Sequence, residues 1–318
     1  MKFKQILPLV LFLVYLPARV VAQEQKKDSL HSGDIKYVTD KFPLTRMFNA
    51  EFRYDAPYTY TSRMHGASLP EAKVTQMYQG RMSTNLSFVK TKKWMVGTGL
   101  FYNYIHAETE QSIHNGAADL HYYAAAVNVT YFSKLFGKMA IYTATAIPSG
   151  GNNGFERVTG LATATLVLKA TAKTKMTLGI FVIADPTSVV PAALSFSYEH
   201  HFNNGWIADV IIPKSIYMKK DMFKDGRLSI GTELDGTMFY INNFNDNKKT
   251  YIYNQLELLS GIKYEHSFYK GVIATLKTGY KYIPSSRIVE KSHLFSNYEF
   301  SARPSGVFYV NVGLSYNP

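Results

Sequence analysis

Large apolar side chains recur at every second position in many short stretches of the chain. The first clear stretch begins at Phe48, where apolar residues alternate with Glu51, Arg53 and other polar residues. The last stretch places its large side chains at Phe308, Val310, Val312, Leu314 and Tyr316. Because successive side chains of a strand point to opposite faces, each stretch predicts a β-strand with one apolar face.

Two kinds of connector separate the predicted strands. Short ones predict tight hairpins, as at Asn203-Asn204-Gly205 and Asp235-Gly236, where Asn and Gly accept the positive φ of two-residue turns. Other short connectors are expected at residues 91–93, 134–137, 172–173 and 268–271. Longer ones contain Pro57 and Pro70, or cover residues 108–116, 148–154, 186–191, 214–224, 242–250 and 284–305. Together they predict about fourteen strands.

This pattern predicts an all-β fold, a transmembrane antiparallel up-and-down β-barrel. An even strand count places both ends of the barrel chain on one side of the membrane, and the stretch from Phe308 is expected to pair with the first strand, near residues 45–54. Twelve strands is the alternative, because residues 228–241 could form one bent strand instead of two. A soluble β-sandwich would bury the same large residues on fewer strands.

The first residues predict an export signal. Two lysines, Lys2 and Lys4, precede a short apolar stretch at residues 6–16, and cleavage is expected after Ala22. An uncleaved anchor helix is disfavoured, because a helix needs roughly 20 apolar residues to cross a bilayer. The expected organisation is a signal peptide at residues 1–22, a periplasmic tail at 23–44 and the barrel at 45–318.

Composition narrows the class of protein further. There are 24 Tyr and 20 Phe against 2 Trp, and a mean hydropathy near zero, at −0.13, is too low for a helical membrane protein. The chain contains no Cys, which excludes disulfides and lipidation at a cysteine. Removing the signal lowers the formal net charge from +12 to +9, and the positive charges are scattered. Scattered charge favours contact with lipid headgroups or an anionic solute over nucleic acid.

If the apolar faces contact lipid, the opposite faces line the lumen. The charged residues expected there are Glu51, Arg53, Arg81, Arg157, Glu199, Asp209, Glu233, Glu257, Lys263, Glu265, Lys277 and Lys281. Both signs occur, so two interpretations stay open: a polar channel that steers solutes, and an interior plugged by ion pairs. About fourteen strands lies between small filled barrels and wide pores.

No catalytic, metal or cofactor site is assigned. A lipid hydrolase would need a nucleophile, a base and an orienting group. The available combinations are His65 with Ser62, His266 with Ser267, and His293 with Ser296 and Asn297. None of them has an oxyanion-hole motif beside it. His200 and His201 are adjacent in a predicted strand, so they point to opposite faces and predict no metal pair.

Four segments carry a resemblance: PLTRMFNAEF at residues 43–52, AKV at 72–74, KKW at 92–94 and GVFYVNVGLSY at 306–316. They are similar to an uncharacterised family of bacterial outer-membrane β-barrel proteins, a domain of unknown function. The resemblance spans the mature chain and implies the outer membrane of a Gram-negative bacterium. It supplies no substrate and no catalytic residue.

The sequence therefore favours a porin-like channel or uptake pore, or a structural envelope protein. A membrane-embedded lipid hydrolase or acyl-modifying enzyme, and ligand binding or adhesion by the loops, are the alternatives. The expected partners are outer-membrane lipid and, during biogenesis, the barrel-assembly machinery; nucleic acid is not expected. The ligand, the oligomeric state and the state of the lumen stay open.

Overall fold

The computed structural model describes residues 40–110, 115–244, 248–269 and 271–318. The expected signal peptide and most of the expected tail lie outside these ranges. The described residues contain no helix that is long and apolar enough to cross a membrane. The strands are β1 Phe48–Asp55, β2 Tyr58–Met64, β3 Ala67–Lys90, β4 Trp94–Glu110, β5 Asn115–Leu135, β6 Lys138–Gly151, β7 Gly154–Ala170, β8 Thr174–Ala184, β9 Ala192–His201, β10 Trp206–Ile212, β11 Ser215–Met222, β12 Gly226–Asn242, β13 Thr250–Ser267, β14 Val272–Glu290, β15 Tyr298–Pro304 and β16 Val307–Tyr316.

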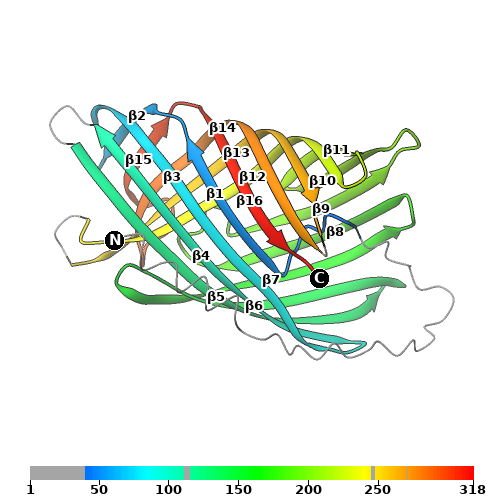
Figure 1. The fold of residues 1–318 in the computed structure, drawn as a ribbon. Helices are drawn as coiled ribbons and strands as arrows, with labels where there is room; N and C mark the ends of the chain where they lie inside the picture. The colour runs from blue at the N-terminus through cyan, green and yellow to red at the C-terminus, as the bar shows by residue number, and fades with distance from the viewer. Residues whose placement is uncertain (1–39, 111–114, 245–247, 270) are drawn as a thin grey trace. The chain divides into compact units, whose positions relative to one another are not determined.

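These strands form one closed antiparallel barrel with fourteen positions in its wall (Figure 1). At two of the fourteen wall positions, two short strands lie end to end in place of one long strand. β1 and β2 lie end to end along β3, and β15 and β16 lie end to end along β14. Every other position is occupied by one strand, in sequence order. The prediction of a barrel of about fourteen strands is confirmed.

The barrel closes between its first and last strands. β1 pairs with β16 from Phe48 opposite Tyr316 to Asp55 opposite Tyr309, as predicted for the terminal stretch. We call the end of the barrel at which Phe48 meets Tyr316 the closing end, and the opposite end the loop end. Short turns at residues 91–93, 136–137, 171–173 and 202–205, and the short connection between β13 and β14, lie at the closing end.

The wall is apolar outside and polar inside. On β16, Phe308 is 70% exposed and Val312 is 49% exposed, whereas Tyr309 and Ser315 are buried. Similar outward apolar residues recur on the other strands, including Ile230 at 48%. A continuous apolar surface of this kind is unfavourable in water and is typical of a barrel that contacts lipid.

Five of the six predicted tight turns are confirmed, and the one at Asp235-Gly236 is wrong. Both residues lie inside β12, opposite Glu257 and Leu256 of β13. The Asp235 carboxylate accepts a hydrogen bond from Arg81 across the barrel, so it serves an inward-facing strand position rather than a turn. The alternative of one bent strand over residues 228–241 is the observed one.

Several predicted long connectors contain strand. Residues 214–224 hold β11, residues 284–305 hold the end of β14 and all of β15, and residues 148–154 contain only a two-residue turn between β6 and β7. The stretch with Pro57 and Pro70 holds β2 and the start of β3. The predicted number of strands is nevertheless correct. The prediction misses β11 but divides β12 into two strands, and these two errors cancel.

The hairpin formed by β10 and β11 interrupts the wall. These strands have 7 and 8 residues, against 17 in β12. β9 pairs with β10 only from Phe196 onward, and β12 pairs with β11 only as far as Glu233. In the described part of the chain, residues 192–195 and 234–242 therefore face each other without a strand between them. We call this opening the wall gap.

The wall gap lies at the depth of the apolar exterior. A strand of 7 residues rises about 23 Å, which a tilt of 35–45° reduces to about 16–19 Å along the barrel axis. The apolar band of outer-membrane barrels is about 25 Å tall. The β10–β11 hairpin begins at the closing end, so lipid on its loop-end side adjoins the gap.

Beyond the gap, the β12–β13 hairpin passes across the inside of the barrel. Phe239 and Tyr240 are adjacent in β12 and point to opposite faces, yet both are at most 1% exposed. Tyr251 and Ile252 of β13 show the same double burial. Phe239 packs in a cluster with residues of β2, β3, β4 and β16, such as Met77. Protein therefore covers both faces of this part of the hairpin.

Candidate functional site

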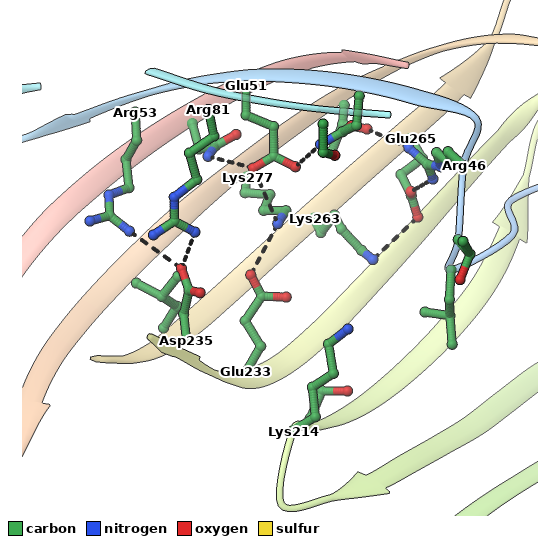
Figure 2. Close-up of a pocket in the computed structure, with 18 of the residues that line it drawn as sticks. Arg46, Glu51, Arg53, Arg81, Lys214, Glu233, Asp235, Lys263, Glu265 and Lys277 are labelled. Atoms are coloured by element: carbon green, nitrogen blue, oxygen red, sulfur yellow. Dashed lines mark hydrogen bonds and ion pairs between the residues drawn. The ribbon is translucent and has the colours of Figure 1, made fainter. Parts of the chain in front are cut away.

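A charged cavity of about 500 Å³ lies inside the closing-end half of the barrel. Seven cationic and four acidic residues are among its described lining. They are Arg46, Arg53, Arg81, Lys214, Lys219, Lys263, Lys277, Glu51, Glu233, Asp235 and Glu265. Figure 2 shows side chains from several strands converging on this space. Cationic groups outnumber acidic ones, so the cavity favours anionic solutes.

Most charges in this cavity are paired with charges on other strands. Lys277 contacts Glu233 at 3.0 Å and Glu51 at 3.9 Å. Arg81 donates to Asp235 and, at 3.0 Å, to the hydroxyl of Thr237. These pairs join β1, β3, β12 and β14, so they link strands that are not neighbours in the wall.

A second group of charges is buried completely beside the cavity. Glu257 accepts hydrogen bonds from the two terminal nitrogens of Arg53, at 2.7 and 3.0 Å. Lys281 donates to Asp55 at 2.5 Å and lies 3.6 Å from Glu257. These side chains are at most 4% exposed, and two cations balance two carboxylates. Paired in this way, buried charges fill the lumen without leaving one uncompensated.

Residues 40–47 close the cavity at the closing end. Phe42 is 4% exposed and lies under the guanidinium of Arg227, whose centre is 4.9 Å from the ring. Arg46 donates to Glu265 and, at 2.7 Å, to Ser315. We call residues 40–47 the inner segment.

Asp40 ties the start of the inner segment to the barrel. Its carboxylate accepts a hydrogen bond from Arg227 at 2.8 Å. Burial raises the pKa of Asp40, but the hydrogen bond and charge of Arg227 outweigh it, and the pKa is lowered below its ordinary value.

Contacts between opposite walls close the interior towards the loop end. The Tyr240 hydroxyl lies 2.8 Å from the Ser149 hydroxyl of β6 and accepts from Arg157 Nε of β7 at 3.2 Å. Arg157 also donates to Asp185 at 2.5 Å. A solute on the barrel axis therefore meets packed side chains on both sides of the charged cavity.

An apolar cavity of about 580 Å³ adjoins the wall gap. Its apolar lining comes from β8, the β8–β9 loop, β10, the β10–β11 turn, β12 and β13: Phe181, Ile183, Val189, Val190, Ile211, Ile212, Pro213, Leu234, Met238 and Leu256. Lys214, Leu234, Asp235 and Gly236 line both this cavity and the charged one. The two cavities thus meet at the turn between β10 and β11 and at the middle of β12.

The structure distributes the expected lumen residues over four places. Seven of the twelve line the charged cavity: Glu51, Arg53, Arg81, Glu233, Lys263, Glu265 and Lys277. Glu257 and Lys281 lie in the buried group, and Arg157 lies in the loop-end contacts. Asp209 is buried against Lys219, and Glu199, opposite Asp209 on β9, pairs with Lys175 at 2.9 Å.

Sequence reasoning missed several residues that shape the site. Lys219 lies in β11, within a stretch that the sequence predicts as a loop, and Asp235 lies in a predicted turn. Their alternation with outward Ile216 and Met218, and with Leu234, was the available signal. Arg46 precedes the first alternating stretch at Phe48, and Lys214 occupies the turn itself, so no periodicity could have identified either.

In the described structure, two histidines of these combinations contact groups other than their serines: His65 lies 2.9 Å from Glu299, and His266 lies 3.2 Å from the Tyr264 hydroxyl. Ser296 donates to its neighbour Asn297 at 3.3 Å, while His293 Nδ1 lies 3.9 Å from Glu290. His293 does form a cluster with Glu290 and Glu299, whose ligand atoms lie within 4.8 Å of one another, although no metal site had been expected. Lys249 already pairs with Glu290 there, at 2.8 Å.

No protein-family model matches the chain, and no curated protein matches its sequence. Among solved structures, the toluene transporter TodX of Pseudomonas putida matches at 12% identity with a TM-score of 0.41, over 87% of this chain and 91% of that chain. An outer membrane channel of Pseudomonas putida F1 matches at 8% identity with a TM-score of 0.35, over 86% and 97%. The transport unit of the Escherichia coli autotransporter AIDA-I matches at 10% identity with a TM-score of 0.31, over 89% and 94%.

Likenesses this distant carry no argument about this chain. Its closed antiparallel β-barrel rests on its own strand pairing. The expected membership in the uncharacterised family stays a prediction.

Proposed function

We propose that the protein is an outer-membrane channel that takes up small amphipathic solutes through its wall. The observation that carries the proposal is the meeting of the apolar and charged cavities at Lys214, Leu234, Asp235 and Gly236, beside the wall gap. A solute dissolved in lipid would enter the apolar cavity through the gap. It would then reach the charged cavity without crossing the contacts around Tyr240.

Release towards the closing end requires the inner segment to move. Its contacts with the barrel include polar ones, of Asp40 with Arg227 and of Arg46 with Glu265 and Ser315, and an apolar one at Phe42. Contacts with water can replace the polar ones, so we assign the inner segment the role of the inner gate. A passive channel of this kind performs no chemical step and needs no cofactor.

Gly236 offers a direct test of the passage. A Cβ atom at this position would have no atom within 4 Å, so a large side chain can be placed there without disturbing the backbone. Gly236→Trp is expected to reduce uptake of a fluorescent amphipathic probe into protein-containing vesicles to the level of empty vesicles. The matched control is Gly80→Trp, which also has open space and lies opposite the lipid-facing Phe52.

Uptake at the wild-type rate by folded Gly236→Trp would contradict the proposal. A planar-bilayer recording gives an independent check. Because side chains fill the axis at both ends of the charged cavity, we expect no large steady conductance from the wild-type protein. A constantly open wide pore would favour a porin instead.

A further inference from the structure

We propose that the junction of the two cavities binds single-chain amphipathic carboxylates, with the Lys214 ammonium holding the carboxylate and the apolar cavity holding the tail. This inference names the solute class of the proposed channel and rests on that function for the route of entry.

Lys214 is a cation without a partner at the boundary of the two cavities. It occupies the two-residue turn between β10 and β11, and its backbone carbonyl accepts a hydrogen bond from Leu234 N at 2.7 Å. No described residue forms an ion pair or hydrogen bond with its ammonium. Figure 2 shows the ammonium directed towards the charged cavity, apart from the paired groups. Its charge is therefore available to an anionic ligand.

The other charged residues of the apolar cavity are already neutralised. Its described lining contains Asp185 and Asp235 besides Lys214. Asp185 accepts from Arg157 at 2.5 Å, and Asp235 accepts from Arg81. A ligand in the apolar cavity therefore meets one uncompensated charge, and that charge is positive.

The tail site has the size and lining of a small-molecule site. Its volume of about 580 Å³ lies within the range of about 300–1,000 Å³ that is typical of ligand pockets. The side chains of Ile183, Ile211 and Met238 and their apolar neighbours surround it. One apolar chain fits such a lining, whereas a polar solute would lose its hydration there without replacement hydrogen bonds.

The charged cavity offers a second polar contact beyond Lys214. Gln79 lines this cavity and is only 2% exposed, yet neither atom of its amide has a hydrogen-bond partner in the described structure. A buried amide without partners is unfavourable, and a ligand carboxylate can accept from its NH2 group. Because Arg53 pairs with Glu257 and Lys219 pairs with Asp209, Lys214 supplies the remaining positive charge of the cavity lining, which disfavours a cationic head group. An anionic head is thus favoured at both steps of the route.

Binding is measured separately from transport. The folded protein in nanodiscs of zwitterionic lipid is titrated with dansyl-undecanoate, a single-chain fluorescent carboxylate, and with its uncharged methyl ester. We expect the carboxylate to bind about tenfold more tightly than the ester, as one charge-assisted hydrogen bond implies. Lys214→Gln should remove this preference by weakening only the carboxylate, and Lys214→Arg should retain it. Lys92→Gln, at a closing-end turn, is the matched control.

Equal affinities for carboxylate and ester in the wild-type protein would overturn the inference. So would a Lys214→Gln variant that keeps the preference. Nanodiscs that contain anionic phospholipid test the other source of an anionic amphiphile: displacement of the probe by that lipid would identify a membrane lipid as occupant and overturn the assignment to single-chain carboxylates.

The two proposals can fail separately. Carboxylate-selective binding without uptake into vesicles would remove the channel function and leave the binding site. Uptake that is blocked by Gly236→Trp but does not distinguish carboxylate from ester would leave the channel and remove the ligand class.

Discussion

Glu257 should be among the most sensitive positions of the barrel to loss of charge. Its carboxylate is fully buried, accepts two hydrogen bonds from Arg53 and lies 3.6 Å from Lys281. Glu257→Gln keeps the size of the side chain but leaves two buried cations with one carboxylate, that of Asp55. Removing one partner of a buried ion pair costs about 3–5 kcal/mol, so we expect a loss of this size in the free energy of unfolding.

The assay is urea unfolding in lipid vesicles, followed by tryptophan fluorescence and by the gel mobility of unheated samples. The matched control is Glu199→Gln. Its carboxylate pairs with Lys175 at 2.9 Å, but these side chains are 25% and 36% exposed. A partly solvated pair of this kind contributes about 0–1 kcal/mol, so the control should unfold close to the wild-type urea concentration.

A double variant separates the lost charge from the lost contact. Replacing both Arg53 and Glu257 with Met removes one cation and one carboxylate, and leaves Lys281 paired with Asp55 at 2.5 Å. We expect it to be more stable than Glu257→Gln, because no charge stays uncompensated. The reasoning is refuted if Glu257→Gln loses less than about 1 kcal/mol or if the double variant is the less stable of the two.

Three further predictions address the inner segment, the packing of β14 against β13, and the pairing of β1 with β16. The pKa of Asp40 is lowered in the folded state, so its contact with Arg227 stabilises the docked inner segment at pH values above 3.8, the ordinary pKa of Asp. This stabilisation is lost as the pH falls from 3.8 through the lowered pKa. A spin label at position 44 should therefore become mobile on acidification. Gly279→Val should cost about 1–3 kcal/mol or prevent folding, because its Cβ would overlap backbone atoms of β13, and gel mobility before heating reports this. Ala50→Cys with Leu314→Cys should form a disulfide on oxidation, seen by gel mobility, since the residues are directly opposed and the chain has no other cysteine.

Each of these has a control in the same chain. Asp40→Asn should abolish the acid response of the label, and an unchanged response would point to another group. Gly80→Ala has open space and should fold normally. Ala50→Cys with Val312→Cys is displaced by two residues and should cross-link poorly; equal cross-linking of both pairs would contradict the register.

The alternation of apolar and polar residues predicted the strands well where the outward side chains are large and apolar. The faces that include Phe308 and Val312 needed only a local pattern, and so did turns such as Asn203-Asn204-Gly205. The pattern was weak where residues face the lumen, as at Lys219, because charged residues are also common in loops. Partners could not be predicted at all: Lys281 meets Asp55 across 226 sequence positions, and that meeting depends on the register of the whole barrel.

The wall gap had no local signal either. It follows from the difference in length between the β10–β11 hairpin and β12, and from the inward course of the β12–β13 hairpin. Gly236 looked like turn chemistry because glycine is common in turns. In the structure it supplies open space between two cavities.

The pairing of β1 with β16 also has a consequence for how the protein is made. Arg46 donates to Ser315 from 269 positions earlier in the chain, and the neighbouring β1–β16 ladder spans a similar separation. Contacts this distant in sequence cost loop-closure entropy before they contribute any stability, so they form late. The free edge of β1 therefore stays unpaired until β16 has joined it. A chain that stops before Val307 should leave an open sheet prone to aggregation, and not a smaller barrel.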